Sequence, residues 1–226
     1  MLNEWQQIVD DEISDWESLG DPDKKKPSPL SQRTKGWAAS VVEGLFGEKA
    51  NNSRKRDLDT LELKTFGVDE GWTPIERFLP LCAFNWQEVN DQSFSESKIK
   101  NKIMQQLWIP ILKNENGLGP NATVEGIGDF TLGPPMIWIP TEAQSNSMAE
   151  DYNRVRIKVM SGSHEDVRAS NFTSINEYLV PNTAGANKLE KTSYHSQDGR
   201  IHNNVKRRKW NLKREIVEEI ISLHRA

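Results

Sequence analysis

The segment LELKT at residues 61–65 constrains the fold of this chain most strongly. Apolar and polar side chains alternate through it, which is the period of a β-strand that buries one face. Because side chains two positions apart share a face of a strand, Glu62 and Lys64 point to one side and Leu61 and Leu63 to the other. We therefore predict a strand whose leucines face the core and whose other face carries an acid beside an amine.

Two further acids, Asp57 and Asp59, lie in the turn just before this strand. Acids grouped beside a lysine are typical of sites that cut phosphodiester bonds. Mg²⁺ held by a few carboxylate oxygens offsets the charge that develops on the phosphate and lowers the pKa of a bound water. The lysine can orient that water or help to deprotonate it. The alternative is a surface hairpin joined by salt bridges, which is the more common structure behind such a pattern.

The acid-x-lysine pattern alone indicates little, because it occurs three times, at Asp23 and Lys25, at Glu62 and Lys64, and at Glu96 and Lys98. Asp23 lies in a proline-rich connector and Glu96 at the start of a predicted helix. The middle pair differs from the other two because it lies on a predicted strand with more acids directly upstream. The context therefore favours this pair as the candidate site.

A fourth acid, Glu43, lies in GWAASVVEGLFG at residues 36–47. The apolar residues of this segment leave its predicted helix almost no polar face, so the helix is expected to be mostly buried. A carboxylate there needs a partner or a raised pKa. Glu43 either reaches the acids near Glu62, lies on the narrow exposed edge of its helix, or pairs with a buried lysine.

Composition sets the broad class of the protein. With 226 residues, 35% of them apolar, the chain can form one large domain or two small ones. Its longest apolar runs are far shorter than the roughly 20 residues that span a bilayer, and the single cysteine, Cys82, excludes intramolecular disulfides. We predict a soluble cytoplasmic protein without a targeting segment.

Charge is distributed unevenly along the chain. The net charge of −4 gives no general indication of nucleic-acid binding. However, the first 23 residues contain eight acids and no base, whereas KRRKWNLKR at residues 206–214 contains six bases. The two ends of the chain are therefore expected to face different partners.

The periodicity along the chain predicts a mixture of helices and strands, and hence an α/β or α+β fold. Helices are expected over residues 3–18, 36–45, 95–107, 149–160 and 212–224, the third of them capped by Ser95. Strands are expected over residues 58–68, 77–86, 107–112, 136–140 and 174–181. Residues 182–204 are expected to form a polar loop.

Two of these motifs together resemble a known family. The segment KGWAASVVEGLFG, followed after a basic loop by RDLDTLELKT, resembles the MutH family of DNA endonucleases. This family comprises the strand-specific nicking enzyme of mismatch repair and related type II restriction endonucleases that cut GATC. Later segments, including SFSESKIKNKIMQQLWIPI and RKWNLKREIVEEIISLH, resemble the family in the same order. The resemblance covers residues 35–224.

The resemblance implies a restriction-endonuclease-like fold, in which a central mixed sheet flanked by helices forms two lobes around a DNA cleft. Residues 1–226 would form one endonuclease domain, with an acidic N-terminal helix and linker over 1–30 and the nuclease core, including a C-terminal lobe that contacts DNA, over 31–226. The resemblance also implies that Glu43, Asp57 and Glu62 hold Mg²⁺, for which Mn²⁺ can substitute. Asp59 remains a rival to Asp57.

The remaining roles also come from the resemblance. Lys64 would assist the nucleophile, and Lys102 matches a lysine near the active site. In three places the chain departs from the family. The spacing between the first acid and Glu62 is shorter, Val180 and Asn182 stand where Arg and Lys flank a proline, and Asn211 replaces an aromatic residue that is associated with sensing adenine methylation. The residues expected to contact DNA are Lys35, Arg54, Lys55, Arg56, Asn182, Lys206, Arg207, Arg208, Lys209, Asn211, Lys213 and Arg214.

The function predicted from the sequence is a Mg²⁺-dependent, sequence-specific endonuclease for double-stranded DNA. A type II restriction enzyme that cuts GATC or a related site is the leading role, because the departures fall at positions that define the repair enzyme's target. The alternatives are a mismatch-repair nicking enzyme activated by a MutL-like ATPase partner, and a DNA-binding protein without catalysis. Cutting both strands requires a dimer on DNA or two successive visits.

Overall fold

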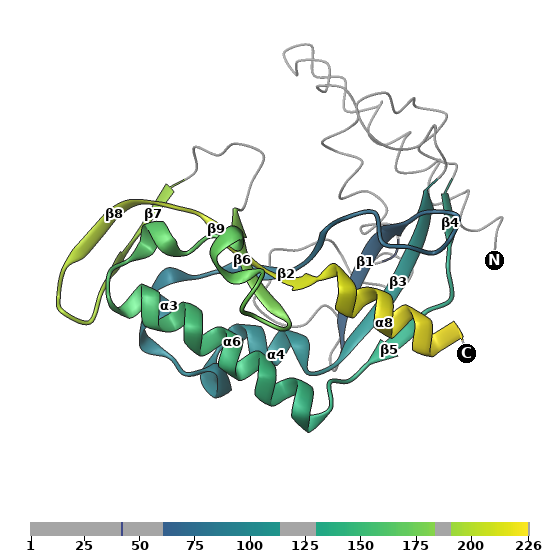
Figure 1. The fold of residues 1–226 in the computed structure, drawn as a ribbon, viewed down its shortest axis with the longest axis horizontal. Helices are drawn as coiled ribbons and strands as arrows, with labels where there is room; N and C mark the ends of the chain where they lie inside the picture. The colour runs from purple at the N-terminus through teal and green to yellow at the C-terminus, as the bar shows by residue number, and fades with distance from the viewer. Residues whose placement is uncertain (1–41, 43–60, 114–129, 184–190, 226) are drawn as a thin grey trace, which may run out of the picture.

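The computed structural model describes residues 42, 61–113, 130–183 and 191–225 of the chain (Figure 1). Its first sheet contains β1 (Glu62–Val68), β3 (Gln106–Lys113), β4 (Phe130–Leu132) and β5 (Met136–Trp138). Strand β1 pairs with β3 in parallel, and β4 and β5 pair with β3 antiparallel. The mixed α/β architecture predicted from the sequence is therefore confirmed.

A second, antiparallel sheet has the strand order β2-β9-β6, where β2 is Phe78–Phe84, β9 is Arg208–Lys213 and β6 is Leu179–Thr183. The basic run at residues 206–214 was expected to meet phosphates just before a helix. Most of the run forms the central strand of this sheet, and its contact with phosphates stays a prediction. Trp210 and Leu212, two residues apart on β9, are both buried on one face of this strand.

A separate hairpin is formed by β7 (Lys191–His195) and β8 (Ile201–Lys206). The prediction of a polar loop over residues 182–204 was therefore wrong. Each strand buries one side chain deeply, Tyr194 on β7 and Val205 on β8, and otherwise shows mostly exposed polar groups. So few apolar positions give little alternation for the sequence to reveal.

The helices in the described residues are α3 (Trp86–Asp91), α4 (Lys98–Ile103), α6 (Glu142–Met160), α7 (Ala169–Phe172) and α8 (Arg214–Arg225), with short 3₁₀ turns at Phe94–Glu96 and His164–Asp166. Helix α4 is capped by Ser97, not by the predicted Ser95, and it ends early because β3 begins at Gln106. Helix α6 begins seven residues before the predicted start, where Thr141 and Gln144 form a capping box. None of the described helices is long and apolar enough to cross a bilayer.

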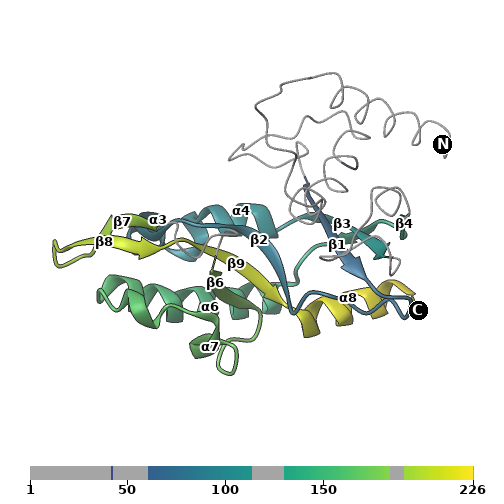
Figure 2. The same ribbon diagram turned by 90° about the horizontal axis from the view of Figure 1, so that it is seen from above.

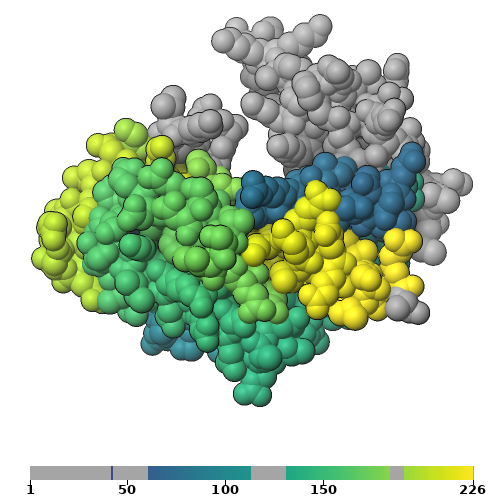
Figure 3. All heavy atoms as spheres, viewed as in Figure 1, coloured from purple at the N-terminus to yellow at the C-terminus, as the bar shows by residue number. Residues whose placement is uncertain are grey.

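Helices α4 and α6 lie on the same side of the β2-β9-β6 sheet (Figure 1). Figure 2 shows α4 near the β2 edge of this sheet and α6 near the β6 edge. Helix α4 contacts β2, and α6 contacts β6. Helix α8 contacts β9, β2 and β5, and Figure 3 shows it in yellow beside the blue residues that follow β1. The C-terminal helix therefore joins the two sheets.

One hydrophobic core includes residues from both sheets, among them Phe66 on β1, Trp108 on β3 and Trp210 on β9. A second cluster covers the other face of the first sheet and contains Val42 and Leu63. Strand β1 is thus buried on both faces, and the predicted core face at Leu63 is confirmed. The expected single domain over 1–226 and the two lobes around a DNA cleft stay predictions.

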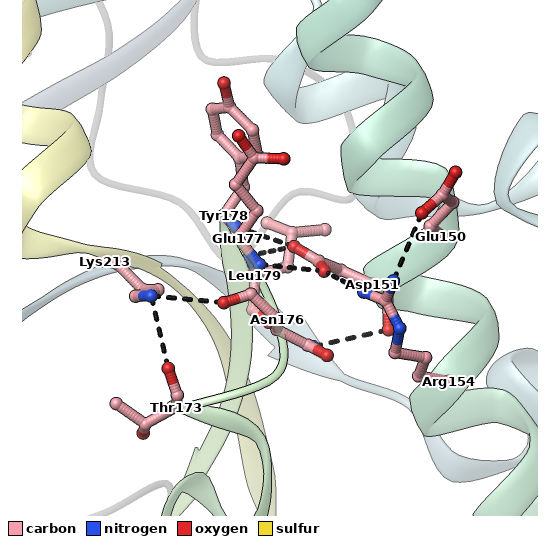
Figure 4. Close-up of polar contacts among 9 residues, drawn as sticks. All are labelled: Glu150, Asp151, Arg154, Thr173, Asn176, Glu177, Tyr178, Leu179 and Lys213. Carbon is pink, nitrogen blue, oxygen red and sulfur yellow. Dashed lines mark hydrogen bonds and ion pairs between the residues drawn. The ribbon is translucent and has the colours of Figure 1, made fainter.

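Helix α6 is tied to the start of β6 by Asp151, whose side chain is fully buried (Figure 4). Its carboxylate accepts hydrogen bonds from the backbone N–H groups of Glu177, Tyr178 and Leu179 at 3.0, 2.6 and 2.9 Å, and from Nη1 of Arg154 at 2.8 Å. Burial raises the pKa of Asp151, while these four donors act in the opposite direction. This junction sets where β6 begins.

Candidate active site

Glu62 is the first residue of β1 and is 1% exposed. Nζ of Lys64, two residues further along the strand, donates a hydrogen bond to Oε1 of Glu62 at 2.7 Å. The prediction that these two side chains share a face is therefore confirmed. The Lys64 side chain keeps 15% of its surface exposed, so solvent reaches this group more readily than the carboxylate.

Lys102 comes to the same carboxylate from α4. Its Nζ donates to both Oε1 and Oε2 of Glu62 at 2.6 Å, across 40 residues of sequence. The prediction for Lys102 rested on the resemblance alone, because no local pattern connects a helical lysine with an acid so far away. The structure places Lys102 in the cluster.

The cluster holds one carboxylate between two ammonium groups, so its formal charge is +1. A buried carboxylate is costly unless it is paired, and the two lysines supply that pairing. An ionised carboxylate offers about four acceptor positions, and the lysines use three of them. The arrangement therefore keeps room for a further cation at Glu62 and favours an anion beside the lysines.

A divalent metal fits this donor set in part. Within the described residues there is no group of three or more His, Cys, Asp or Glu side chains that can hold a metal ion. Mg²⁺ is commonly held by one or two carboxylates together with waters and substrate phosphates, and Glu62 supplies one such carboxylate. A carboxylate oxygen as ligand favours Mg²⁺ or Mn²⁺ over softer metals.

The other predicted metal ligands, Glu43, Asp57 and Asp59, lie outside the described residues. Val42, which precedes Glu43 in the chain, is described and fully buried. It packs with Leu63, on the face of the sheet opposite to Glu62.

The residues predicted to contact DNA fall into several groups. Lys35, Arg54, Lys55 and Arg56 lie outside the described residues. Lys206 at the end of β8 and Arg207 between β8 and β9 are exposed, and Lys209 and Asn182 are partly buried. For this set, contact with DNA stays a prediction.

The other predicted DNA contacts take part in packing. Nζ of Lys213 donates to the backbone carbonyls of Thr173 and Asn176 at 3.2 and 3.1 Å (Figure 4). Nε of Arg214 donates to Oε1 of Glu218 at 2.6 Å, one turn along α8. Both side chains are therefore engaged within the protein.

Arg208 and Asn211 are buried on β9. Nη1 of Arg208 donates to Oγ1 of Thr183 at 3.1 Å, and burial lowers the pKa of this guanidinium. Nδ2 of Asn211 donates to the backbone carbonyls of Lys209 and Val180 at 3.0 and 3.4 Å. In the conformation described, Asn211 joins β9 to β6 and presents no side-chain surface to a ligand.

Sequence analysis did not single out Gln106, which pairs with Glu62 in the register of β3 and β1. It is fully buried. A polar residue at the first position of an apolar strand, after a helix that carries Lys102, is the one signal in the sequence that pointed to it.

Comparison with known proteins agrees with this geometry. The family model described as "DNA mismatch repair enzyme MutH" matches residues 46–151, a range that includes Glu62, Lys64 and Lys102. The DNA mismatch repair protein MutH of Shewanella amazonensis is 25% identical over 178 residues, which are 77% of this chain and 74% of the relative. That of Vibrio parahaemolyticus is 23% identical over 195 residues, 85% of this chain and 80% of the relative. The chain is therefore similar to the MutH family, through a family model that matches residues 46–151 and relatives that align over most of its length.

Proposed function

We propose that this protein hydrolyses phosphodiester bonds in double-stranded DNA with Mg²⁺, for which Mn²⁺ can substitute. The observation that carries the proposal is the contact of Lys64 and Lys102 with the buried carboxylate of Glu62. A structural salt bridge needs one lysine for one carboxylate. A second lysine adds a positive charge that suits a phosphate.

Each residue of the cluster has a distinct role in this proposal. Glu62 would hold the metal, together with Asp57, or Asp59 in its place, and Glu43. Bound there, Mg²⁺ lowers the pKa of a water and offsets charge on the phosphate. The Lys64 ammonium, the more exposed of the two, orients the attacking water and stabilises the pentavalent phosphorus. Lys102 holds the carboxylate of Glu62 in place.

We further propose the mismatch-repair role as the first candidate, in which the protein nicks DNA when a MutL-like ATPase partner is present. The relatives described above are named DNA mismatch repair proteins. A restriction enzyme for GATC or a related site is the second candidate. It is favoured by Val180, which is fully buried in the segment expected to read bases and so offers no polar contact there. Either role agrees with the predicted cytoplasmic location.

The test is digestion of unmethylated, hemimethylated and fully methylated plasmids that contain GATC sites, with Mg²⁺ and with or without a MutL-like protein and ATP. Lys64→Ala should abolish cleavage. The matched control is Lys158→Ala, because Lys158 on α6 is 48% exposed and pairs only loosely, at 3.6 Å, with Asp166. It should cut like the wild type.

The products distinguish the roles. Nicks that depend on the partner support the repair enzyme, and discrete linear fragments without it support restriction. DNA that stays intact under every condition, or cleavage that persists in Lys64→Ala, would overturn the proposal. Binding without cleavage would leave the non-catalytic DNA-binding protein as the better account.

A further inference from the structure

The side chain of Gln106 is a buried primary amide beside the candidate active site. It lies at the first position of β3, directly opposite Glu62 on β1, and has no exposed surface. A buried amide is costly unless its donors and its acceptor find partners. The hydrogen-bond partners of the Gln106 side chain therefore indicate its role.

On one side, Nε2 of Gln106 donates to the backbone carbonyl of Lys102 at 2.9 Å. Lys102 lies in the last turn of α4. Carbonyls in the last turn of a helix have no partner within the helix and need one from outside. Gln106 thus holds the backbone from which the Lys102 side chain departs.

On the other side, Oε1 of Gln106 accepts a hydrogen bond from Nε1 of Trp108 at 2.7 Å. Trp108 is itself fully buried, with its ring centroid 5.6 Å from that of Phe66 and 5.1 Å from that of Trp138. These aromatic contacts fix the indole, and the indole fixes the orientation of the Gln106 amide.

We propose that Gln106 is a positioning residue that holds the ammonium group of Lys102 against both oxygens of Glu62. Its effect on catalysis rests on the proposed nuclease function, whereas its effect on Lys102 does not. Helix α4 has only six residues, too few for a stable helix by themselves. An anchor at its last turn therefore restrains the long Lys102 side chain more than packing of the helix alone.

The first test observes the Lys102 ammonium group directly. Lysine ammonium groups are recorded by ¹H–¹⁵N NMR at low temperature, and Lys102→Met identifies the signal. In Gln106→Leu, which keeps the size and removes both hydrogen bonds, we expect the signal to broaden and to shift toward that of a solvated lysine. The matched control is Gln105→Leu, the same change at a partly buried neighbour whose side chain lies outside this network.

The second test is a double-mutant cycle on DNA cleavage. Gln106→Leu should lower kcat on the order of tenfold, the expected scale for a slightly displaced catalytic group, and leave KM for DNA nearly unchanged. In a Lys102→Met background the same substitution should have no further effect on kcat. A residue needed only for stability would lower activity in both backgrounds and would not show this cancellation.

The outcomes separate the inference from the proposed function. An unchanged Lys102 signal in Gln106→Leu, or an equal loss of kcat in both backgrounds, would overturn the role of Gln106. Absence of cleavage by the wild type would instead reject the nuclease, and the NMR signal would still decide the positioning role. If Gln106→Leu does not fold, Gln106→Glu keeps an acceptor for Trp108, removes the donor to Lys102, and should give the same loss of signal.

Discussion

Glu62 and Asp151 are both buried carboxylates, with 1% and 0% of their surface exposed, yet they are satisfied in different ways. Glu62 is paired with the ammonium groups of two lysine side chains. Asp151 accepts three hydrogen bonds from backbone N–H groups and one from Arg154. The two sites are similar in burial and opposite in the nature of their partners.

The partners determine what each carboxylate can do. Backbone N–H groups are fixed by the fold, so Asp151 is committed to holding α6 against β6. Lysine side chains are flexible and carry charge, so a metal and a phosphate can take over part of the pairing at Glu62. Burial of a carboxylate therefore indicates only that it needs partners. The kind of donor around it distinguishes a structural role from a catalytic one.

The largest expected effect follows from applying the same chemical change at both sites. Glu62→Gln should lower the rate of DNA cleavage by on the order of 10³-fold, because it removes the proposed metal ligand and the charged partner of Lys64. Asp151→Asn should retain most of the activity at temperatures where it is folded. Plasmid cleavage with Mg²⁺ measures both, and a severe loss in folded Asp151→Asn would break the comparison.

For stability the same two variants should rank in the opposite order, with the larger loss of unfolding free energy in Asp151→Asn. Asp151→Asn is expected to lower the free energy of unfolding by about 3 kcal/mol, because it removes the buried charge that pairs with Arg154 and replaces one of two acceptor oxygens with an NH₂ donor that faces N–H groups. Glu62→Gln should cost less, since Lys64 already reaches solvent. Urea unfolding followed by fluorescence measures both. Equal losses would show that the Glu62 cluster is as structural as the Asp151 junction.

A smaller effect tests the same distinction on the lysines. Lys213 donates to two backbone carbonyls, so Lys213→Met should lower the free energy of unfolding by about 1–2 kcal/mol and leave DNA binding unchanged.

Lys206 is exposed, so Lys206→Ala should keep the free energy of unfolding unchanged and, if Lys206 meets a phosphate, should reduce the slope of log K for DNA binding against log salt concentration by about 1. DNA binding titrated at several salt concentrations measures the second effect, and an unchanged slope would remove Lys206 from the interface.

The smallest expected effect concerns an exposed carboxylate. The hydroxyl of Ser196, the backbone N–H of Arg200 and the Arg200 guanidinium lower the pKa of Asp198 to about 2 from its usual 3.8. A lowered pKa stabilises the β7–β8 turn above pH 3.8, and this contribution is lost as the pH falls through about 2. Amide NMR shifts of Gly199 and Arg200 should follow that titration, and Asp198→Asn should show no such step.

Local patterns predicted the parts of the site that lie close together in sequence. The alternation over residues 61–65 was enough to place Glu62 and Lys64 on one face, which the structure confirms. The same reasoning missed the β7–β8 hairpin, because each strand buries only one or two side chains. It also predicted no strand over the basic run, where Trp210 and Leu212 are buried among charged residues.

The sequence by itself determined the mixed fold class, the acid and amine on one strand face, and the similarity to the MutH family. Tertiary structure decided that Lys102 contacts that acid and that Gln106 lies opposite it, because the parallel pairing of β1 with β3 brings these distant segments together. It also decided that Lys213 and Asn211 serve packing. A sequence pattern encodes which face a side chain takes, whereas its partners depend on how distant segments pair.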